Sequence, residues 1–221
     1  MQQKASYLSE ALTTAHKLES KELKKLNNKR NYLIVKRLID IIFSVIGLVI
    51  SVPLIIFFGV LIKVETPGPV FYTQERVGLN GKLFNVIKLR SMVNDAERNG
   101  AQWAQKNDPR VTKVGHFIRK TRIDELPQFI NILKGDMSLV GPRPERPNFT
   151  IQFNQQIPGF ITRLSIKPGL TGLAQVNGGY DISPKEKFEL DRQYIENLGL
   201  ITDLKIILKT VAVCFNGNGA R

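Results

Sequence analysis

IIFSVIGLVISVPLIIFFGVLI, residues 41–62, is the stretch that decides the fold of this 221-residue chain, because none of its side chains is charged. As an α-helix it would extend about 33 Å, enough to match the hydrocarbon core of a bilayer. A cleaved signal peptide is a weaker reading, since the stretch begins forty residues into the chain, exceeds a signal's apolar region and precedes no small-residue cleavage pattern. The stretch therefore predicts a membrane segment.

Charges on both sides of this stretch favour the same compartment. Lys36, Arg37 and Asp40 stand directly before the apolar residues, where we expect them at the membrane interface. Downstream, residues 63–221 carry 23 basic and 15 acidic side chains. Because basic flanks are retained in the cytoplasm, neither end of the segment is expected outside the cell.

Pro53 lies near the middle of the apolar stretch, with Ser51 two residues before it. A proline removes one backbone donor from a helix and clashes with the preceding turn, while a serine hydroxyl can satisfy a freed backbone group. One arrangement is a break at these residues that returns both ends to one face of the membrane. The other is a kinked helix that spans it, and this region alone does not choose between them.

The composition of the chain indicates one globular domain that binds a negatively charged partner. Hydrophobic residues make up 43% of the chain and charged residues 23%, which excludes wholesale disorder and a bundle of many membrane helices. The net charge of +13 favours a polyanion as partner: nucleic acid, acidic lipid or a phosphorylated metabolite. A single cysteine, Cys214, excludes an intrachain disulfide, and two histidines make a Cys/His metal site implausible.

Turn and capping signals divide the chain after the membrane segment. Asn80-Gly81 between two β-prone runs predicts a β-hairpin, and Ser183 with Glu186 forms a capping box at the start of a helix. The remaining expectations follow from periodicity and breakers. They are a charged surface helix in 1–30, strands at 70–75, 83–90 and 137–140, a short helix and loop in 92–113, helices at 124–134, 183–198 and 203–215, and a turn at 167–172.

The acidic pair Asp124-Glu125 can be read in two ways. Asp is a preferred N-cap and Glu suits a first helical turn, so the pair could simply begin the helix that follows. Arg119, Lys120 and Arg122 precede it, however, and a capped helix does not need that excess of positive charge. Cations around a helix N-terminus are typical of a phosphate site.

Other cations could converge on the same place. Lys88 and Arg90 are two residues apart on a predicted strand and so share a face, and Arg143 is held between two prolines. Each could merely be solvated. Together they suggest an anion site that contains carboxylates, which there can hold a divalent cation or attack phosphorus.

These residues belong to a set of motifs that resembles a known family, the bacterial sugar transferases or small monotopic phosphoglycosyl transferases. Order and spacing agree from residue 36 to about residue 210. The motifs are KRLID (36–40), KLRSM (88–92), DPRVTKVG (108–115), TRIDELPQ (121–128), SLVGPRP (138–144) and KPGLTGLAQV (167–176).

The resemblance implies transfer of sugar 1-phosphate from a UDP-sugar to undecaprenyl phosphate with release of UMP, at the start of capsule, exopolysaccharide or glycoconjugate assembly. It implies Asp124 as the nucleophile that forms an aspartyl phosphosugar, Glu125 as its catalytic partner and Mg²⁺ at Asp124. It also implies phosphate-facing roles for the cations named above, Lys88, Arg90, Arg122 and Arg143.

The resemblance further implies a re-entrant segment, membrane lipids as partners, no nucleic acid, and a domain on the cytoplasmic face of the bacterial inner membrane; a homodimer stays open. We therefore expect a small monotopic α/β (α+β) protein with a β-hairpin and amphipathic surface helices. Its parts would be an extension (1–35), a re-entrant helix-break-helix (36–63) and a catalytic domain (64–221). The rival functions are a basic membrane-anchored module without turnover and a glycosyl transferase that releases UDP.

Overall fold

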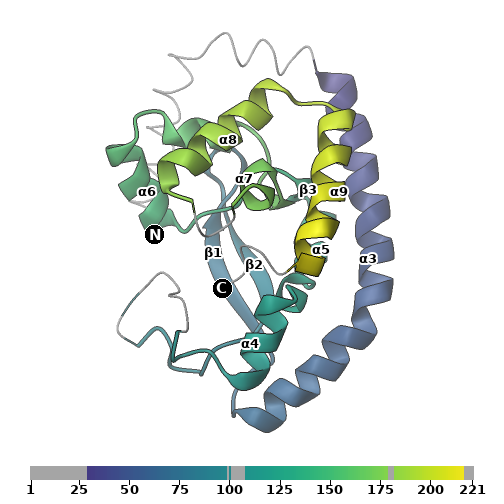
Figure 1. Ribbon diagram of the computed structural model, residues 1–221, viewed down its shortest axis with the longest axis vertical. Helices are drawn as coiled ribbons and strands as arrows, with labels where there is room; N and C mark the ends of the chain where they lie inside the picture. Colours follow the sequence, from purple (N-terminus) through teal and green to yellow (C-terminus); the bar gives the residue numbers. More distant parts are fainter. Residues whose placement is uncertain (1–28, 99, 101–107, 179–181, 217–221) are drawn as a thin grey trace.

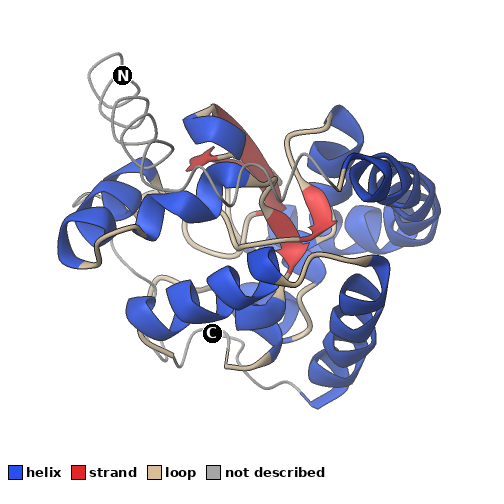
Figure 2. Ribbon diagram, turned by 90° about the horizontal axis from the view of Figure 1, so that it is seen from above, coloured by secondary structure: helices blue, strands red, loops and turns tan. Residues whose placement is uncertain are grey.

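The computed structural model describes residues 29–98, 100, 108–178 and 182–216, without the side chains of 214–216. The charged helix expected in residues 1–30 lies almost wholly outside these residues. Within them the chain folds as helices around two small sheets, and the longest helix runs along one side of the molecule (Figure 1). Seen from above, this helix is viewed nearly down its axis at one edge (Figure 2).

The apolar stretch lies in α3 (Arg30–Glu65), a helix of 36 residues that is long and apolar enough to cross a membrane. It begins before the predicted boundary at residue 36. The helix is not interrupted at Pro53, so the predicted helix-break-helix is instead one continuous helix that curves along the domain (Figure 1). Its outward face is apolar and exposed, as at Val49, Ile50 and Ile56.

Local hydrogen bonding explains why α3 bends without breaking. Ser51 donates through Oγ to the carbonyl of Gly47 at 2.5 Å, within the turn that precedes Pro53. Such back-bonding by serine competes with the helical ladder and bends a helix, and the proline removes one further ladder bond. The two residues that predicted a break thus produce a bend.

Polar residues at the start of α3 fasten it to the rest of the domain. Asp40 is buried and accepts hydrogen bonds from the Leu139 amide at 2.9 Å and the Ser138 hydroxyl at 3.1 Å. Arg37 donates to the carbonyls of Ile132 at 2.6 Å and of Leu133 at 2.8 Å. We predicted a membrane-interface position for these residues; the structure gives them partners inside the protein.

Lys36 completes this attachment through the last helix, α9 (Leu200–Asn216). Its Nζ lies 2.7 Å from a carboxylate oxygen of Asp203, which also accepts a hydrogen bond from Tyr32 at 2.8 Å. The other carboxylate oxygen accepts from Tyr194 at 2.7 Å. One buried aspartate therefore joins the start of α3 to α8 (Pro184–Glu196) and α9.

The predicted hairpin is confirmed as β1 (Phe71–Val77) and β2 (Leu83–Leu89), antiparallel and joined by η1 (Leu79–Gly81). The helix α5 (Gln128–Lys134) lies against it, because Asn131 donates to the carbonyl of Asn85 and accepts from the amide of Ile87. α5 also packs on α3, where a Cβ at Gly47 would lie 2.7 Å from the ring of Phe129. α5 ends at Lys134, the predicted last residue of this helix, and Gly135 follows in a left-handed conformation.

A second, parallel sheet pairs β3 (Ser138–Val140) with β4 (Gly169–Thr171). The region predicted as a turn at 167–172 thus contains a strand. Backbones approach so closely here that a Cβ at Gly169 would lie 2.1 Å from the amide nitrogen of Gly141. β3 packs in the main core with Ile132, Tyr194 and Ile206.

The other helices surround these sheets. The capping box of Ser183 and Glu186 is confirmed at the start of α8. The described residues of 92–112 form only turns and a bridge between Met92 and Val111, and a helix begins only at Lys113. The remaining elements are α4 (Lys113–Lys120), η2 (Ile123–Glu125), α6 (Pro147–Gln156), η3 (Phe160–Ser165) and α7 (Leu173–Val176).

Candidate active site

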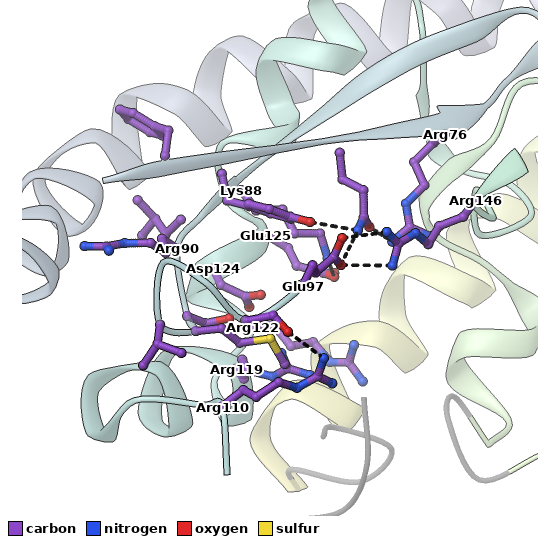
Figure 3. Close-up of a pocket in the computed structure, with 18 of the residues that line it drawn as sticks. Arg76, Lys88, Arg90, Glu97, Arg110, Arg119, Arg122, Asp124, Glu125 and Arg146 are labelled. Atoms are coloured by element: carbon purple, nitrogen blue, oxygen red, sulfur yellow. Dashed lines mark hydrogen bonds and ion pairs between the residues drawn. The ribbon is translucent and has the colours of Figure 1, made fainter. Parts of the chain in front are cut away.

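A cleft of about 260 Å³ opens beside the hairpin and contains the acidic pair (Figure 3). Its walls come from β1, the end of β2, the turn η2 and the loop before α6. Basic side chains dominate the lining. They are Arg76, Lys88, Arg90, Arg110, Arg119, Arg122, Arg143, Arg146 and Lys187, with Asp124, Glu125, Glu97 and Glu145 among them.

A short 3₁₀ turn presents the acidic pair to this cleft. Asp124 and Glu125 lie in η2, and Arg122 before them adopts a left-handed conformation with φ 57°. The reading of Asp124 as the N-cap of α5 is wrong, because α5 begins only at Gln128, after Pro127. The backbone of Arg122 is unusual for a non-glycine residue, and such conformations concentrate at functional sites.

Glu125 is held by two of the predicted cations. Its Oε1 lies 2.6 Å from Lys88 Nζ and 2.5 Å from Arg143 NH2, and its Oε2 accepts from Arg143 NH1 at 3.4 Å. Burial favours the neutral form, but Arg143 and Lys88 outweigh it and hold the pKa of Glu125 well below its ordinary value of 4.5. Glu125 is therefore an ionised anchor that aims Lys88 and Arg143 into the cleft.

The carboxylate of Asp124 has a different environment. It is only 7% exposed, and no residue that the structure describes donates a hydrogen bond to it or pairs with it (Figure 3). Burial raises its pKa to about 6, an effect that Lys88 opposes and Glu125 reinforces. A poorly solvated carboxylate beside cations is suited to attack an electrophile that those cations bind.

The two other residues predicted to face phosphate, Arg122 and Arg90, differ in their position relative to the acidic pair. Arg122 lines the cleft beside the acidic pair. Arg90 also borders the cleft, but its guanidinium donates to the carbonyls of Pro67 at 2.5 Å and Thr66 at 2.8 Å. It points away from Asp124 (Figure 3), because β2 ends at Leu89 and the strand alternation stops there. Arg90 thus fixes the chain leaving α3 rather than facing the acidic pair.

Sequence reasoning missed the far wall of the cleft. Arg146 holds Glu97 through two hydrogen bonds of 2.9 and 2.7 Å, and Arg76 lies beside them (Figure 3). The available signals were the second arginine of the Pro-Arg-Pro-Glu-Arg-Pro run and the strand face that Arg76 shares with Gln74. Neither signal predicts which residue the arginine binds.

The donor set suits a divalent cation only in part. No group of three or more acidic, histidine or cysteine side chains comes together among the described residues. Glu125 is committed to two cations, which leaves Asp124 as one available carboxylate. Mg²⁺ in phosphate sites is commonly bound by one or two carboxylates, substrate phosphates and water, so Asp124 together with a diphosphate fits it.

Comparison with known proteins assigns this arrangement to a family. The model of the family described as bacterial sugar transferase matches residues 31–217, which include α3, both sheets and the cleft. The chain belongs to the bacterial sugar transferase family.

Individual relatives of this sugar transferase are similar over much of the chain. The UDP-N-acetylgalactosamine-undecaprenyl-phosphate N-acetylgalactosaminephosphotransferase of Aeromonas hydrophila is 45% identical over 220 residues, which cover 97% of this chain and 52% of the relative. The UDP-glucose:undecaprenyl-phosphate glucose-1-phosphate transferase of Escherichia coli (strain K12) is 40% identical over 183 residues, 80% of this chain and 39% of the relative.

A protein of Bacillus subtilis (strain 168) is 64% identical over 133 residues, which cover 60% of this chain and 74% of the relative. The chain thus spans about half or less of the Aeromonas and Escherichia relatives, and most of the Bacillus one.

Proposed function

We propose that this sugar transferase moves sugar 1-phosphate from a UDP-sugar to undecaprenyl phosphate and releases UMP. The observation that carries the proposal is the carboxylate of Asp124, which has no partner among the described residues, beside an ionised Glu125 in a cationic cleft. The names of the Aeromonas and Escherichia relatives supply the substrate class.

The first step is attack by a carboxylate oxygen of Asp124 on the β-phosphorus. An oxygen–phosphorus bond forms, the bond from that phosphorus to the bridging oxygen breaks, and UMP leaves with the bridging oxygen and its electron pair. In the second step an oxygen of undecaprenyl phosphate attacks the same phosphorus and the aspartyl bond breaks. Asp124 is then regenerated and the product is the polyprenyl diphosphate sugar.

The cations of the cleft act on the charge that this reaction moves. Lys88 and Arg143 are fixed on Glu125 at 2.6 and 2.5 Å, so they need little reorganisation when a diphosphate enters. Arg122 and Arg119 line the same wall beside Asp124. Mg²⁺, held by Asp124 and phosphate oxygens, would offset phosphate charge when bound.

Both ends of α3 contact one globular body, which supports a monotopic rather than a spanning arrangement. Near its start Asp40 binds β3, while at its end Glu65 accepts from the amides of Lys113 and Val114 in α4. A spanning helix would place these two contacts on opposite sides of a hydrocarbon core about 30 Å thick. A helix lying in one leaflet, with the cleft on the cytoplasmic face of the bacterial membrane, avoids that separation.

The test is a release assay with purified protein, Mg²⁺, a short-chain undecaprenyl phosphate analogue and UDP-N-acetylgalactosamine, UDP-glucose or UDP-galactose. UMP is expected as the released nucleotide, and Asp124→Asn should abolish its release while leaving membrane association intact. Release of UDP would identify a glycosyl transferase instead. No release of either nucleotide, with Asp124→Asn without effect in cells, would favour a non-catalytic module.

A further inference from the structure

The loop that carries Arg143 is held in an unusual way. Prolines at 142, 144 and 147 lack an amide hydrogen, so much of this loop can be fixed only through its carbonyl groups. Three successive carbonyls each accept a hydrogen bond. The Arg143 carbonyl accepts from Arg163 at 2.8 Å, the Pro144 carbonyl from Arg76 at 3.0 Å, and the Glu145 carbonyl from the Val77 amide at 3.0 Å.

Arg163 is the donor at the residue whose side chain binds Glu125. It lies in η3 and is 3% exposed, with its guanidinium 4.9 Å from the centre of the Phe160 ring. Asp191 of α8, 1% exposed, lies 2.7 Å from Arg163 NH2. The ring and the carboxylate leave this guanidinium little freedom, so the position of the Arg143 carbonyl is well defined.

Stability alone does not account for the pair of Arg163 and Asp191. Burying two charges is expensive, and apolar replacements of such pairs are often neutral or stabilising. Burial raises the pKa of Asp191 to about 6, even though Arg163 lowers it, so the ionised form is held at a disadvantage. The Nε of Arg163 also lacks a hydrogen-bond partner. The pair is better explained by the direction it gives to the loop.

We propose that Arg163, oriented by Asp191, is a positioning residue that places the phosphate-binding side chain of Arg143 on Glu125. This inference rests on the proposed function for the role of Arg143. Arg163 does not line the cleft. It acts at one remove, through the backbone carbonyl of Arg143, and the stiff Pro-Arg-Pro backbone passes that constraint to the side chain.

A double-mutant cycle tests the proposal on kcat/KM for the UDP-sugar that releases UMP. Arg163→Met is expected to lower kcat/KM about tenfold, and Arg143→Ala by about 10- to 100-fold, the range for lost charge-assisted hydrogen bonds. In the Arg143→Ala background, adding Arg163→Met should change kcat/KM less than about twofold. Arg163→Lys keeps a donor and the charge, and it should restore part of the loss.

A matched control removes another largely buried ion pair. Lys36 of α3 and Asp203 of α9 have side chains 11% and 9% exposed, and their ion pair joins these two helices without involving the Arg143 loop. Lys36→Met should lower kcat/KM by the same factor in both backgrounds, as a purely structural effect does. If Arg163→Met behaves like this control, with equal factors in both backgrounds, the positioning role is overturned.

Hydrogen–deuterium exchange gives a readout that needs no substrate. In Arg163→Met the amides of Arg143 and Glu145 should exchange faster, while the hairpin amide of Val86 keeps its protection. Unchanged exchange in the loop would overturn the proposal even if the wild-type protein turned over UDP-sugars. If exchange in the loop is faster in Arg163→Met but the wild-type protein releases no UMP, the positioning of the loop stands and the proposed function fails.

Discussion

Replacing Asp124, the proposed nucleophile, should stabilise the protein. Burial raises the pKa of Asp124 to about 6 from an ordinary value of 3.8. Because the unfolded chain releases the proton more readily, the folded state is penalised wherever the carboxylate is ionised. At 1.36 kcal/mol per pH unit the penalty is about 3 kcal/mol at pH 7.5 and falls to about 1 kcal/mol at pH 4.5. Asp124→Asn removes it.

The charge of the neighbouring carboxylate, Glu125, has the opposite effect on stability. Lys88 and Arg143 lower the pKa of Glu125, so its charge stabilises the fold above its ordinary pKa of 4.5 and that contribution is lost as the pH falls through the lowered value. Glu125→Gln leaves two largely buried cations against a neutral amide. It should therefore destabilise the protein at pH 7.5, by about 2 kcal/mol.

Thermal melts followed by circular dichroism in detergent, without Mg²⁺, compare the two variants. For a chain of this length 1 kcal/mol corresponds to about 2–4 °C. Asp124→Asn should raise Tm by up to about 6–12 °C at pH 7.5, with a smaller gain at pH 4.5, and Glu125→Gln should lower it. A lowered Tm for Asp124→Asn at pH 7.5, or a gain independent of pH, would refute the reasoning.

Three further outcomes follow from individual contacts. Lys88 lowers the pKa of Asp124, so Lys88→Met should move the rise of UMP release with pH upward by about one unit, and an unmoved profile would contradict this electrostatic role. Asp40→Ala strands a buried amide and should lower the free energy of unfolding by about 2–4 kcal/mol in denaturant titrations, whereas a change below about 0.5 kcal/mol would show that the contact is dispensable. Gly47→Val places a carbon within 2.7 Å of the Phe129 ring and should reduce stability by about 1–3 kcal/mol; Phe129→Ala in the same chain should relieve part of it.

Local signals in the sequence predicted α3, the hairpin, α5, β3, α8 and α9, whereas α4, α6, α7 and β4 were not predicted. Asn80-Gly81 marked the hairpin, and the capping box marked the start of α8. Each of these depends on residues close together in the chain, whose conformational preferences survive folding. The acidic pair was also identified, because more basic residues precede it than the start of a helix requires.

Contacts between distant residues could not be predicted in the same way. Arg90 donates to two carbonyls that precede it by more than twenty residues, and its strand pattern does not predict these acceptors. The pair of Arg163 and Asp191 comes from η3 and α8, and the sequence shows only an ordinary arginine and aspartate. Pro53 and Ser51 predicted a break, but in the structure they only bend α3, which continues as one helix from Arg30 to Glu65.

The polar contacts that attach α3 to the domain limit how a water-soluble form of this protein can be made. A chain shortened to residue 64 onward would lose Asp40 and Arg37, which satisfy the Leu139 amide and the carbonyls of Ile132 and Leu133. The helix is thus part of the fold and not a removable tag. Solubility would have to be engineered on its outward face, at Val49 and neighbouring exposed positions, with the inward polar residues kept.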